Sequence, residues 1–323
     1  MGLTPHTRRP IFAAVIATAG AIALSACAPV GAVPATAPAT VSASPSASAP
    51  AAPSSSPSSE QSSVSPTPTQ ETTAPPSPSP SATSAPDALV VGANHIGSAA
   101  SYVYPAKLVQ QWLQGEVKPT EKIVFLTFDD GPNHKTTPVI LEALKEADVH
   151  ATFYVVGSML DEAPELLKRE VAEGNAINLH SWSHNYKKLY PKRHGNTEVI
   201  VDEYERTLAK VREILGPDFN TEGWRYPGGH MSWKGLADAD AALASHGVSW
   251  VDWNADTADS APKATRPTTI AGLVANATIP IDNGFHVAVV LGHDTPDKAL
   301  TSQAVPAIIK AYKDAGYSFG VIS

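Results

Sequence analysis

Two adjacent carboxylates, Asp129 and Asp130, follow a run of apolar and β-branched residues at 123–128 and precede the turn residues Gly131 and Pro132. A short apolar run closed by turn residues is typical of a buried strand, so both carboxylates are expected at the edge of a sheet. Two neighbouring carboxylates repel each other and are costly to desolvate without a cation. The alternative is a pair of solvated turn aspartates, which the polar residues further along the chain disfavour.

His180 and His184 stand four residues apart, the spacing at which a helical turn places two imidazoles on one side. This spacing is a weak signal by itself, because two histidines on one helix face are more often structural. Together with an unpaired carboxylate, however, they would supply three ligands to a metal ion and leave one position open, which is the catalytic pattern for zinc. Adjacent residues leaving a strand point in different directions, so we expect one aspartate to bind the metal and the other to act as a base.

The segments that must position these residues alternate between strand and helix patterns. Strands are predicted at 123–128, 151–156, 176–179, 223–227, 248–253, 286–291 and 317–322. Helices are predicted at 139–147, 163–173, 198–215, 233–245, 268–275 and 299–315. Seven strands alternating with helices predict an α/β fold with a parallel sheet, and the strand count favours a (β/α)7-type barrel over an open sheet. A short helix at 107–114 precedes the alternation, and residues 88–121 have no predicted role.

Further candidate site residues collect at the ends of the predicted strands, where a (β/α) barrel builds its active site. They are Arg225, Gly228, Gly229, Asp256, Asp259 and His293. Arg225 is expected to orient the base carboxylate, the alternative being a surface ion pair. His293 has a structural alternative as a hydrogen-bonded loop residue, and the two glycines can let backbone N–H groups approach a ligand or simply form a turn. Tyr226, Trp253 and Leu291 are candidates to line the substrate pocket, with packing in the core as the alternative.

In this order, these residues resemble a known family pattern. The matching segments are Thr127-Phe128-Asp129-Asp130-Gly131-Pro132, His180-Ser181-x-x-His184, Arg225-x-Pro227, Asp256-x-x-Asp259 and Leu291-x-His293. They are similar to the five ordered motifs of the polysaccharide deacetylases, the NodB-homology domain of carbohydrate esterase family 4. The resemblance covers roughly residues 121–323. It implies a distorted (β/α) barrel and metal-dependent removal of acetyl groups from N-acetylglucosamine polymers or acetylated xylan.

The resemblance also implies a role for each matching residue. Asp129 would be the catalytic base and His293 the catalytic acid, with Arg225 steadying the base and Asp259 orienting the acid. The Gly228 N–H would help to hold the oxyanion. The metal ligands would be Asp130, His180 and His184. The implied cofactor is a divalent metal, zinc or alternatively cobalt.

Three positions depart from the family pattern. Ser260 stands where many members have tryptophan, Gly228 where many have tyrosine, and Leu179 where many have asparagine. These positions belong to the pocket wall rather than to the ligands or the acid–base pair. The departures therefore affect the expected substrate preference and leave the expected chemistry unchanged.

Residues 1–27 have the pattern of a bacterial lipoprotein signal peptide. Arg8 and Arg9 precede an apolar run at 11–24, which is too short to span a bilayer comfortably. The following residues, 24–27, resemble a lipobox that ends in Cys27, the only cysteine of the chain. We expect cleavage before Cys27 and acylation of its sulfur, the alternative being an ordinary signal peptide followed by a spare thiol.

Residues 28–86 consist almost entirely of Ala, Pro, Ser, Thr and Val. They are expected to form a disordered tether, because such a segment has too little apolar side chain to bury. Residues 87–323 would then be the catalytic domain, a lipid-anchored monomer on the outer face of the cell membrane that reaches the cell wall. The formal net charge of −8 comes with no basic patch, which argues against a nucleic-acid partner.

The expected function is therefore metal-dependent hydrolysis of N-acetyl groups on a cell-wall polysaccharide, with N-acetylglucosamine of peptidoglycan as the expected substrate. Within the same chemistry, the alternative is a deacetylase of chitooligosaccharides or acetylxylan. An alternative of another class is a catalytically inactive glycan-binding lipoprotein, which the complete set of motif residues disfavours. A barrel glycosidase would use two carboxylates and need no metal, so the paired histidines argue against it.

Overall fold

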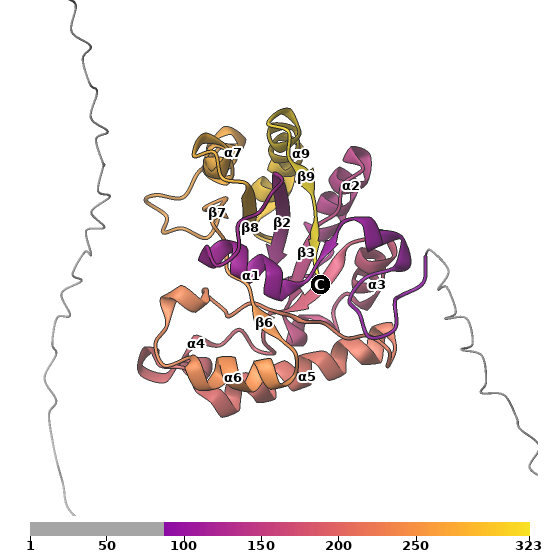
Figure 1. Cartoon of the computed structure of the whole chain (residues 1–323), viewed down its shortest axis with the longest axis vertical. Helices are drawn as coiled ribbons and strands as arrows, with labels where there is room; N and C mark the ends of the chain where they lie inside the picture. The colour runs from indigo at the N-terminus through magenta and orange to yellow at the C-terminus, as the bar shows by residue number, and fades with distance from the viewer. Residues whose placement is uncertain (1–86) are drawn as a thin grey trace, which may run out of the picture. The chain divides into compact units, whose positions relative to one another are not determined.

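The computed structural model describes residues 87–323 (Figure 1). The predicted signal peptide with Cys27 and the predicted tether at 28–86 lie outside the described residues. The apolar run that precedes the two carboxylates forms β2 (Ile123–Asp129), and all of its residues are buried. Because β2 is apolar on both faces, it suits a central strand that is covered from two sides.

β2 lies in the middle of a curved parallel sheet with strand order β6-β5-β4-β3-β2-β8-β7, and β9 also pairs with the start of β2. The other strands are β3 (Thr152–Val155), β4 (Ala176–Leu179), β5 (Gly223–Trp224), β6 (Ser249–Trp250), β7 (Ala255–Asp256), β8 (Val287–His293) and β9 (Ser318–Phe319). Within residues 87–323, β6 and β7 end the order without pairing with each other. The sheet is thus an open half-barrel, which confirms the predicted α/β class and its distorted parallel barrel.

The last predicted strand, 317–322, differs from the structure. It is divided into β9 and β10 (Val321–Ile322), and β10 pairs with β1 (Val103–Tyr104) in a separate two-stranded sheet. The division falls at Gly320, where an added Cβ atom would lie 2.7 Å from the Phe125 ring, so the backbone passes too close for any side chain. The two-residue strand β7 is absent from the sequence prediction, because two residues carry no periodicity.

Helices follow the strands and cover the outer face of the sheet (Figure 1). The long ones are α2 (Thr137–Ala147), α3 (Pro164–Ala172), α5 (Thr197–Leu215), α6 (Ala237–Ser245), α7 (Ile270–Ala277) and α9 (Ala299–Asp314). Short elements that the sequence patterns do not predict are α4 (Tyr186–Leu189), α8 (Ile279–Asp282) and 3-10 turns at Gly97–Ser101, Gly157–Met159, Pro191–Arg193 and His230–Ser232. The predicted helix at 233–245 begins later, at Ala237.

Alternation along β2 separates two packing surfaces. Val124, Leu126 and Phe128 pack with the covering helices in the main core. Ile123 and Phe125 face the inside of the half-barrel, in a second cluster. The next two positions of this inner row are Thr127 and Asp129, so the row that is apolar at the start of β2 becomes polar at its carboxyl end.

The helix α1 (Ala106–Gln114) closes the inside of the half-barrel near the amino ends of the strands (Figure 1). Its residues Ala106 and Val109 are fully buried and belong to the same cluster as Ile123, Phe125 and Val287. The segment at 88–121, to which the sequence assigns no role, therefore completes the inner core.

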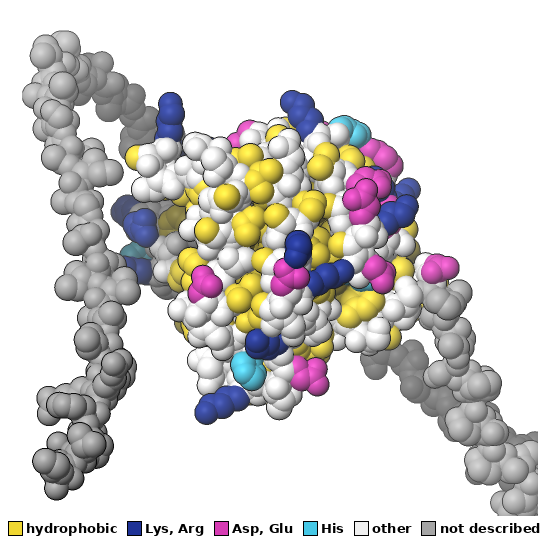
Figure 2. All heavy atoms as spheres, turned by 90° about the horizontal axis from the view of Figure 1, so that it is seen from above, with side chains coloured by type: hydrophobic (Ala, Val, Ile, Leu, Met, Phe, Trp, Pro, Cys, Tyr) yellow, Lys and Arg dark blue, Asp and Glu magenta, His cyan; other side chains and the backbone are white. Residues whose placement is uncertain are grey.

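No helix within residues 87–323 is long and apolar enough to cross a membrane. On the face shown in Figure 2, the Lys and Arg side chains are scattered among acidic and apolar ones. This part of the described surface thus has no basic patch of the kind that binds nucleic acid.

Candidate active site

The carboxyl ends of neighbouring strands bring the predicted site residues together. Asp129 ends β2 and is the direct register partner of His293, which ends β8. His180 directly follows β4, and Arg225 directly follows β5. Residues that are far apart in the sequence therefore meet at one edge of the sheet, where a parallel α/β fold builds its active site.

Asp130, His180 and His184 are the only group of three potential metal ligands found among residues 87–323. The Nε2 atoms of His180 and His184 lie 3.6 and 3.4 Å from Asp130 Oδ1. This oxygen is buried and has no hydrogen-bond partner among the described residues. Because an unpartnered buried carboxylate oxygen is costly, and a cation between the three side chains would satisfy it, these residues fit a divalent metal ion.

The backbone conformation at Asp130 directs this ligand into the site. Strict alternation after Asp129 would point the Asp130 side chain toward the outer face of the sheet. Its φ of 79° instead lies in the left-handed region, which is uncommon for a residue other than glycine. Strain of this kind is typical of functional sites, where the surrounding structure maintains it.

The two histidines are not related by the predicted helical turn. His180 leaves β4, and a bend with left-handed residues at Ser181 (φ 69°) and His184 (φ 51°) brings the second ring to 5.0 Å from the first, centroid to centroid. The Glu203 carboxylate of α5 holds this bend by accepting hydrogen bonds from the N–H groups of Trp182 and Ser183. The two imidazoles therefore lie close together, as predicted, but tertiary contacts bring them there and not a helical turn.

The protonation state of His180 suits a metal ligand. Its Nδ1 lies 2.7 Å from the carbonyl oxygen of Arg225, which can only accept, so Nδ1 carries the proton. The other nitrogen, Nε2, is thus unprotonated and faces Asp130. Burial, followed by the neighbouring His184, lowers the pKa of His180 to about 3, so the ring is neutral, as metal binding requires.

Asp129 is buried and held by Arg225, whose Nη1 donates to Asp129 Oδ1 at 2.8 Å. Arg225 is itself fully buried, with its guanidinium stacked 3.9 Å from the centre of the Tyr154 ring. The other carboxylate oxygen, Oδ2, lies 3.5 Å from His180 Nε2. Burial raises the pKa of Asp129, while the charges of Arg225 and His293 oppose this shift. Arg225 therefore holds Oδ1 of Asp129, and Oδ2 faces the candidate metal ligands.

His293 is paired with Asp259. His293 Nδ1 lies 2.7 Å from Asp259 Oδ1, and the backbone N–H of His293 donates to Asp259 Oδ2 at 3.0 Å. Burial alone would lower the pKa of His293, but the hydrogen bond and the charge of Asp259 outweigh it and raise the pKa to about 9. Since Nδ1 faces Asp259, Nε2 remains to donate a proton into the site, as a general acid must.

We expect Asp259→Asn to move the alkaline limb of the pH profile of kcat/KM to lower pH. The protonated form of His293 is present below its pKa of about 9 and is lost as the pH rises through that value. Without the carboxylate, burial acts unopposed by this partner, so the limb should fall by roughly one unit or more, toward or below the ordinary histidine pKa. Rates measured from about pH 6 to about pH 10 test this, and an unmoved limb would contradict the pairing.

The predicted pocket-wall residues occupy different places. Gly228 has a φ of 80°, and its N–H donates no hydrogen bond within residues 87–323, so it is free for a ligand. Trp253 is partly exposed beside the Arg225 guanidinium, 5.6 Å from the ring centre. Leu291 is buried on the inner row, one layer below His293. The Tyr226 side chain departs from the prediction, because it is fully buried in the main core.

Three buried acidic side chains support the site without any signal in the sequence. Besides Glu203, Asp252 accepts hydrogen bonds from the N–H groups of His230 and Met231, in the loop after Gly229. Asp294 joins the loops of the base and of the acid: its N–H donates to the carbonyl of Asp129, and its carboxylate accepts from Thr137. Burial raises the pKa of Asp294 to about 7. These side chains bond to partners 20 or more residues away, beyond the reach of a local motif.

Comparisons with known proteins agree with this geometry. The family described as polysaccharide deacetylase matches residues 116–248. A peptidoglycan-N-acetylglucosamine deacetylase of Bacillus cereus is 35% identical over 205 residues, which cover 61% of this chain and 68% of that protein. The putative polysaccharide deacetylase YheN of Bacillus subtilis is 31% identical over 215 residues, 67% of this chain and 72% of that protein.

Among solved structures, a Streptococcus mutans CE4 esterase superposes with a TM-score of 0.70 and 45% sequence identity. The match covers 74% of this chain and 100% of that one. The sequence relatives and this structural neighbour agree with the five motifs and with the half-barrel that gathers them. The chain therefore belongs to the polysaccharide deacetylases of carbohydrate esterase family 4, hydrolases that remove acetyl groups from polysaccharides.

Proposed function

We propose that this protein is a metal-dependent deacetylase that hydrolyses the N-acetyl groups of N-acetylglucosamine in peptidoglycan. The observation that carries the proposal is the buried, unpartnered Oδ1 of Asp130 between two histidines, next to the Arg225-bound carboxylate of Asp129. A site of this kind combines three metal ligands with a separate base. The nearby His293 adds an acid that is protonated at neutral pH.

The metal would be held by Asp130, His180 and His184, and zinc suits this set of two nitrogens and one oxygen, with cobalt as the alternative. When bound, the ion supplies Lewis-acid polarisation of the acetyl carbonyl and activation of a water molecule. Three protein ligands leave positions open for substrate and water, which is the catalytic rather than the structural pattern.

The side chains of the protein supply the proton transfers. Asp129, held through Oδ1 by Arg225, accepts a proton from the attacking water. The free N–H of Gly228 donates to the oxyanion that develops at the acetyl carbonyl oxygen, a contact whose loss costs on the order of 3 kcal/mol. His293, oriented by Asp259, protonates the departing amine through Nε2. An amine is a poor leaving group without this proton.

The named relatives guide the choice of substrate. A Bacillus cereus relative is a peptidoglycan-N-acetylglucosamine deacetylase, which favours an amide in the cell wall. The Streptococcus mutans neighbour is described as an esterase, so acetyl esters, for example on xylan, form the second candidate. Lipid anchoring at Cys27 would place the enzyme next to the wall, and this remains part of the proposal.

The test is acetate release by the purified protein from peptidoglycan, from N-acetylglucosamine oligomers and from acetylxylan. We expect release from peptidoglycan to vanish after treatment with a chelator and to return with zinc or cobalt. Undiminished release in the chelator would contradict the metal site. If acetate were released from acetylxylan alone, the proposed substrate would be an acetyl ester and not an amide.

A further inference from the structure

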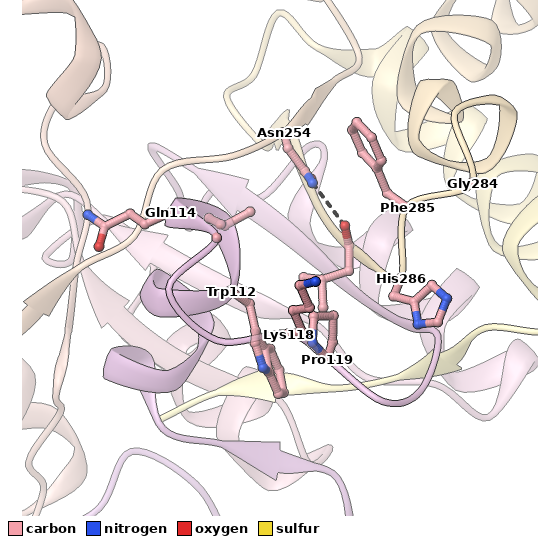
Figure 3. Close-up of a pocket in the computed structure, with 11 residues that line it drawn as sticks. Trp112, Gln114, Lys118, Pro119, Asn254, Gly284, Phe285 and His286 are labelled. Carbon is pink, nitrogen blue, oxygen red and sulfur yellow. Dashed lines mark hydrogen bonds between the residues drawn. The ribbon is translucent and has the colours of Figure 1, made fainter.

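A hollow of about 570 Å³ lies against the carboxyl end of α1, separate from the candidate active site (Figure 3). Figure 3 shows Trp112 and Gln114 on one side of it and Phe285 and His286 on the other. The hollow lies at the start of β8, whereas His293 lies at the end of that strand, so the two are roughly 20 Å apart along six residues.

A second hollow, of about 200 Å³, connects this region with the active-site wall. Leu113, Gln114 and Asn254 line both hollows, and the second one also includes Met231 and Trp253. Trp253 lies beside the guanidinium that holds the base, and its ring would block any side chain at Gly229. We call the two hollows together the α1 groove. It follows the seam between β6 and β7, where the half-barrel is open.

The lining of the α1 groove suits a sugar chain. It combines aromatic rings, which present apolar faces, with the exposed amide of Gln114, which can both donate and accept hydrogen bonds. The rings are Trp112, Trp250, Trp253 and Phe285. The other two amides, Gln110 and Asn254, already donate to the backbone carbonyls of Trp250 and Val287. Two of the apolar side chains are open to solvent, since Phe285 is 45% and Met231 62% exposed.

The charge of the first hollow favours an anionic ligand over a cationic one. Lys118 lines the first hollow, and no described residue that lines this hollow is acidic, although the whole chain has a net charge of −8. The one carboxylate of the second hollow, Asp252, already accepts hydrogen bonds from the N–H groups of His230 and Met231. A glycan that carries carboxylates would therefore meet a complementary charge at Lys118.

One wall of the groove comes from outside the family match. The polysaccharide deacetylase match begins at residue 116, and α1 ends at Gln114. Its residues Gln110, Leu113 and Gln114 line the groove, while Ala106 and Val109 anchor the helix in the inner core. The segment before the family match thus adds one wall of this groove to the catalytic domain.

We propose that the α1 groove binds the glycan strand several sugars away from the reacting acetyl group, and that its ligand is a carboxylate-bearing, N-acetylated glycan. The proposal rests on the proposed function of the active site. It predicts that the enzyme favours long glycan strands over short ones and strands with acidic sugars over neutral ones.

The test compares kcat/KM for a disaccharide and for long oligomers, with Phe285→Ala in the otherwise complete protein. Losing the contact with this ring should lower kcat/KM for long oligomers roughly tenfold, through KM, and leave the disaccharide unchanged. Ile279→Ala is the matched control, because Ile279 is 44% exposed, close to the 45% of Phe285, but does not line either hollow. Equal losses on both substrates, or none on either, would overturn the proposal.

Lys118→Gln tests the charge. Oligomers that contain N-acetylmuramic acid should lose roughly threefold in kcat/KM, whereas chitin oligomers of equal length, which lack carboxylates, should not change. An equal change of kcat/KM for the two oligomers would contradict the preference for acidic sugars.

The two proposals fail separately. If the wild-type protein released no acetate from any glycan, calorimetric titration with the same oligomers would still test the groove. Weaker binding by Phe285→Ala would then support glycan binding by the α1 groove, even though the proposed catalytic function had failed. Unaltered binding would overturn the groove, as would a concentration-dependent dimer that Phe285→Ala abolishes, because a second copy would then be its occupant.

Discussion

Asp129→Asn should lower kcat for deacetylation by roughly 10³-fold, within the range that general-base catalysis contributes, and should leave metal binding nearly unchanged. Asparagine keeps the size of the side chain, and its carbonyl oxygen can still accept the hydrogen bond from Arg225 Nη1 that now reaches Oδ1 at 2.8 Å. It cannot take a proton from water. The expected loss is therefore chemical, and it should appear in kcat more than in KM.

The measurement combines steady-state kinetics with metal content and thermal unfolding of the same preparation. Asp297→Asn serves as a control, because it removes one carboxylate that is 66% exposed and is bonded to Lys298 and Thr295 and to no described site residue. That variant should retain nearly full activity. If Asp129→Asn stayed within tenfold of the wild type with metal bound, another group would have to be the base.

His293→Ala should distinguish an amide from an activated ester. Protonation of the departing amine contributes roughly 10² to 10⁴ in rate, and an aryl oxide leaves without such help. We therefore expect a loss of about 10³-fold on an N-acetyl substrate and of less than about tenfold on an aryl acetate. The pKa of about 9 means that wild-type His293 is already in its acid form at neutral pH.

Both substrates are assayed with the same enzyme preparation, so that unfolding or metal loss would lower both rates alike. His134→Ala provides a surface control, since the His134 side chain is 65% exposed and, within residues 87–323, forms polar contacts only with Glu165 and the carbonyl of Glu162. Parallel losses on amide and ester would show that His293 has a structural role or supports the metal instead of acting as the acid.

The order of strands and helices could be predicted from the sequence because it depends on local patterns. The apolar runs of β2 and β8 and the periodicity of the helices α2, α5 and α9 can each be recognised within a short window. The residue types of the candidate site could be predicted as well. Strand ends in a parallel fold lie at one edge, so Asp129, His180, Arg225 and His293 had to meet once the fold was known.

The tertiary structure alone decided how these side chains are aimed. The left-handed backbone at Asp130 aims one ligand, and the bend at Ser181 and His184 replaces the predicted helical turn. The distant carboxylate of Glu203 supports that bend. The same holds for Asp294, whose partners Asp129 and Thr137 lie at the end of β2 and the start of α2, more than 100 residues away. Periodicity reports only on neighbours in the chain, whereas these contacts depend on the register of the sheet and on the packing of α2 and α5 against it.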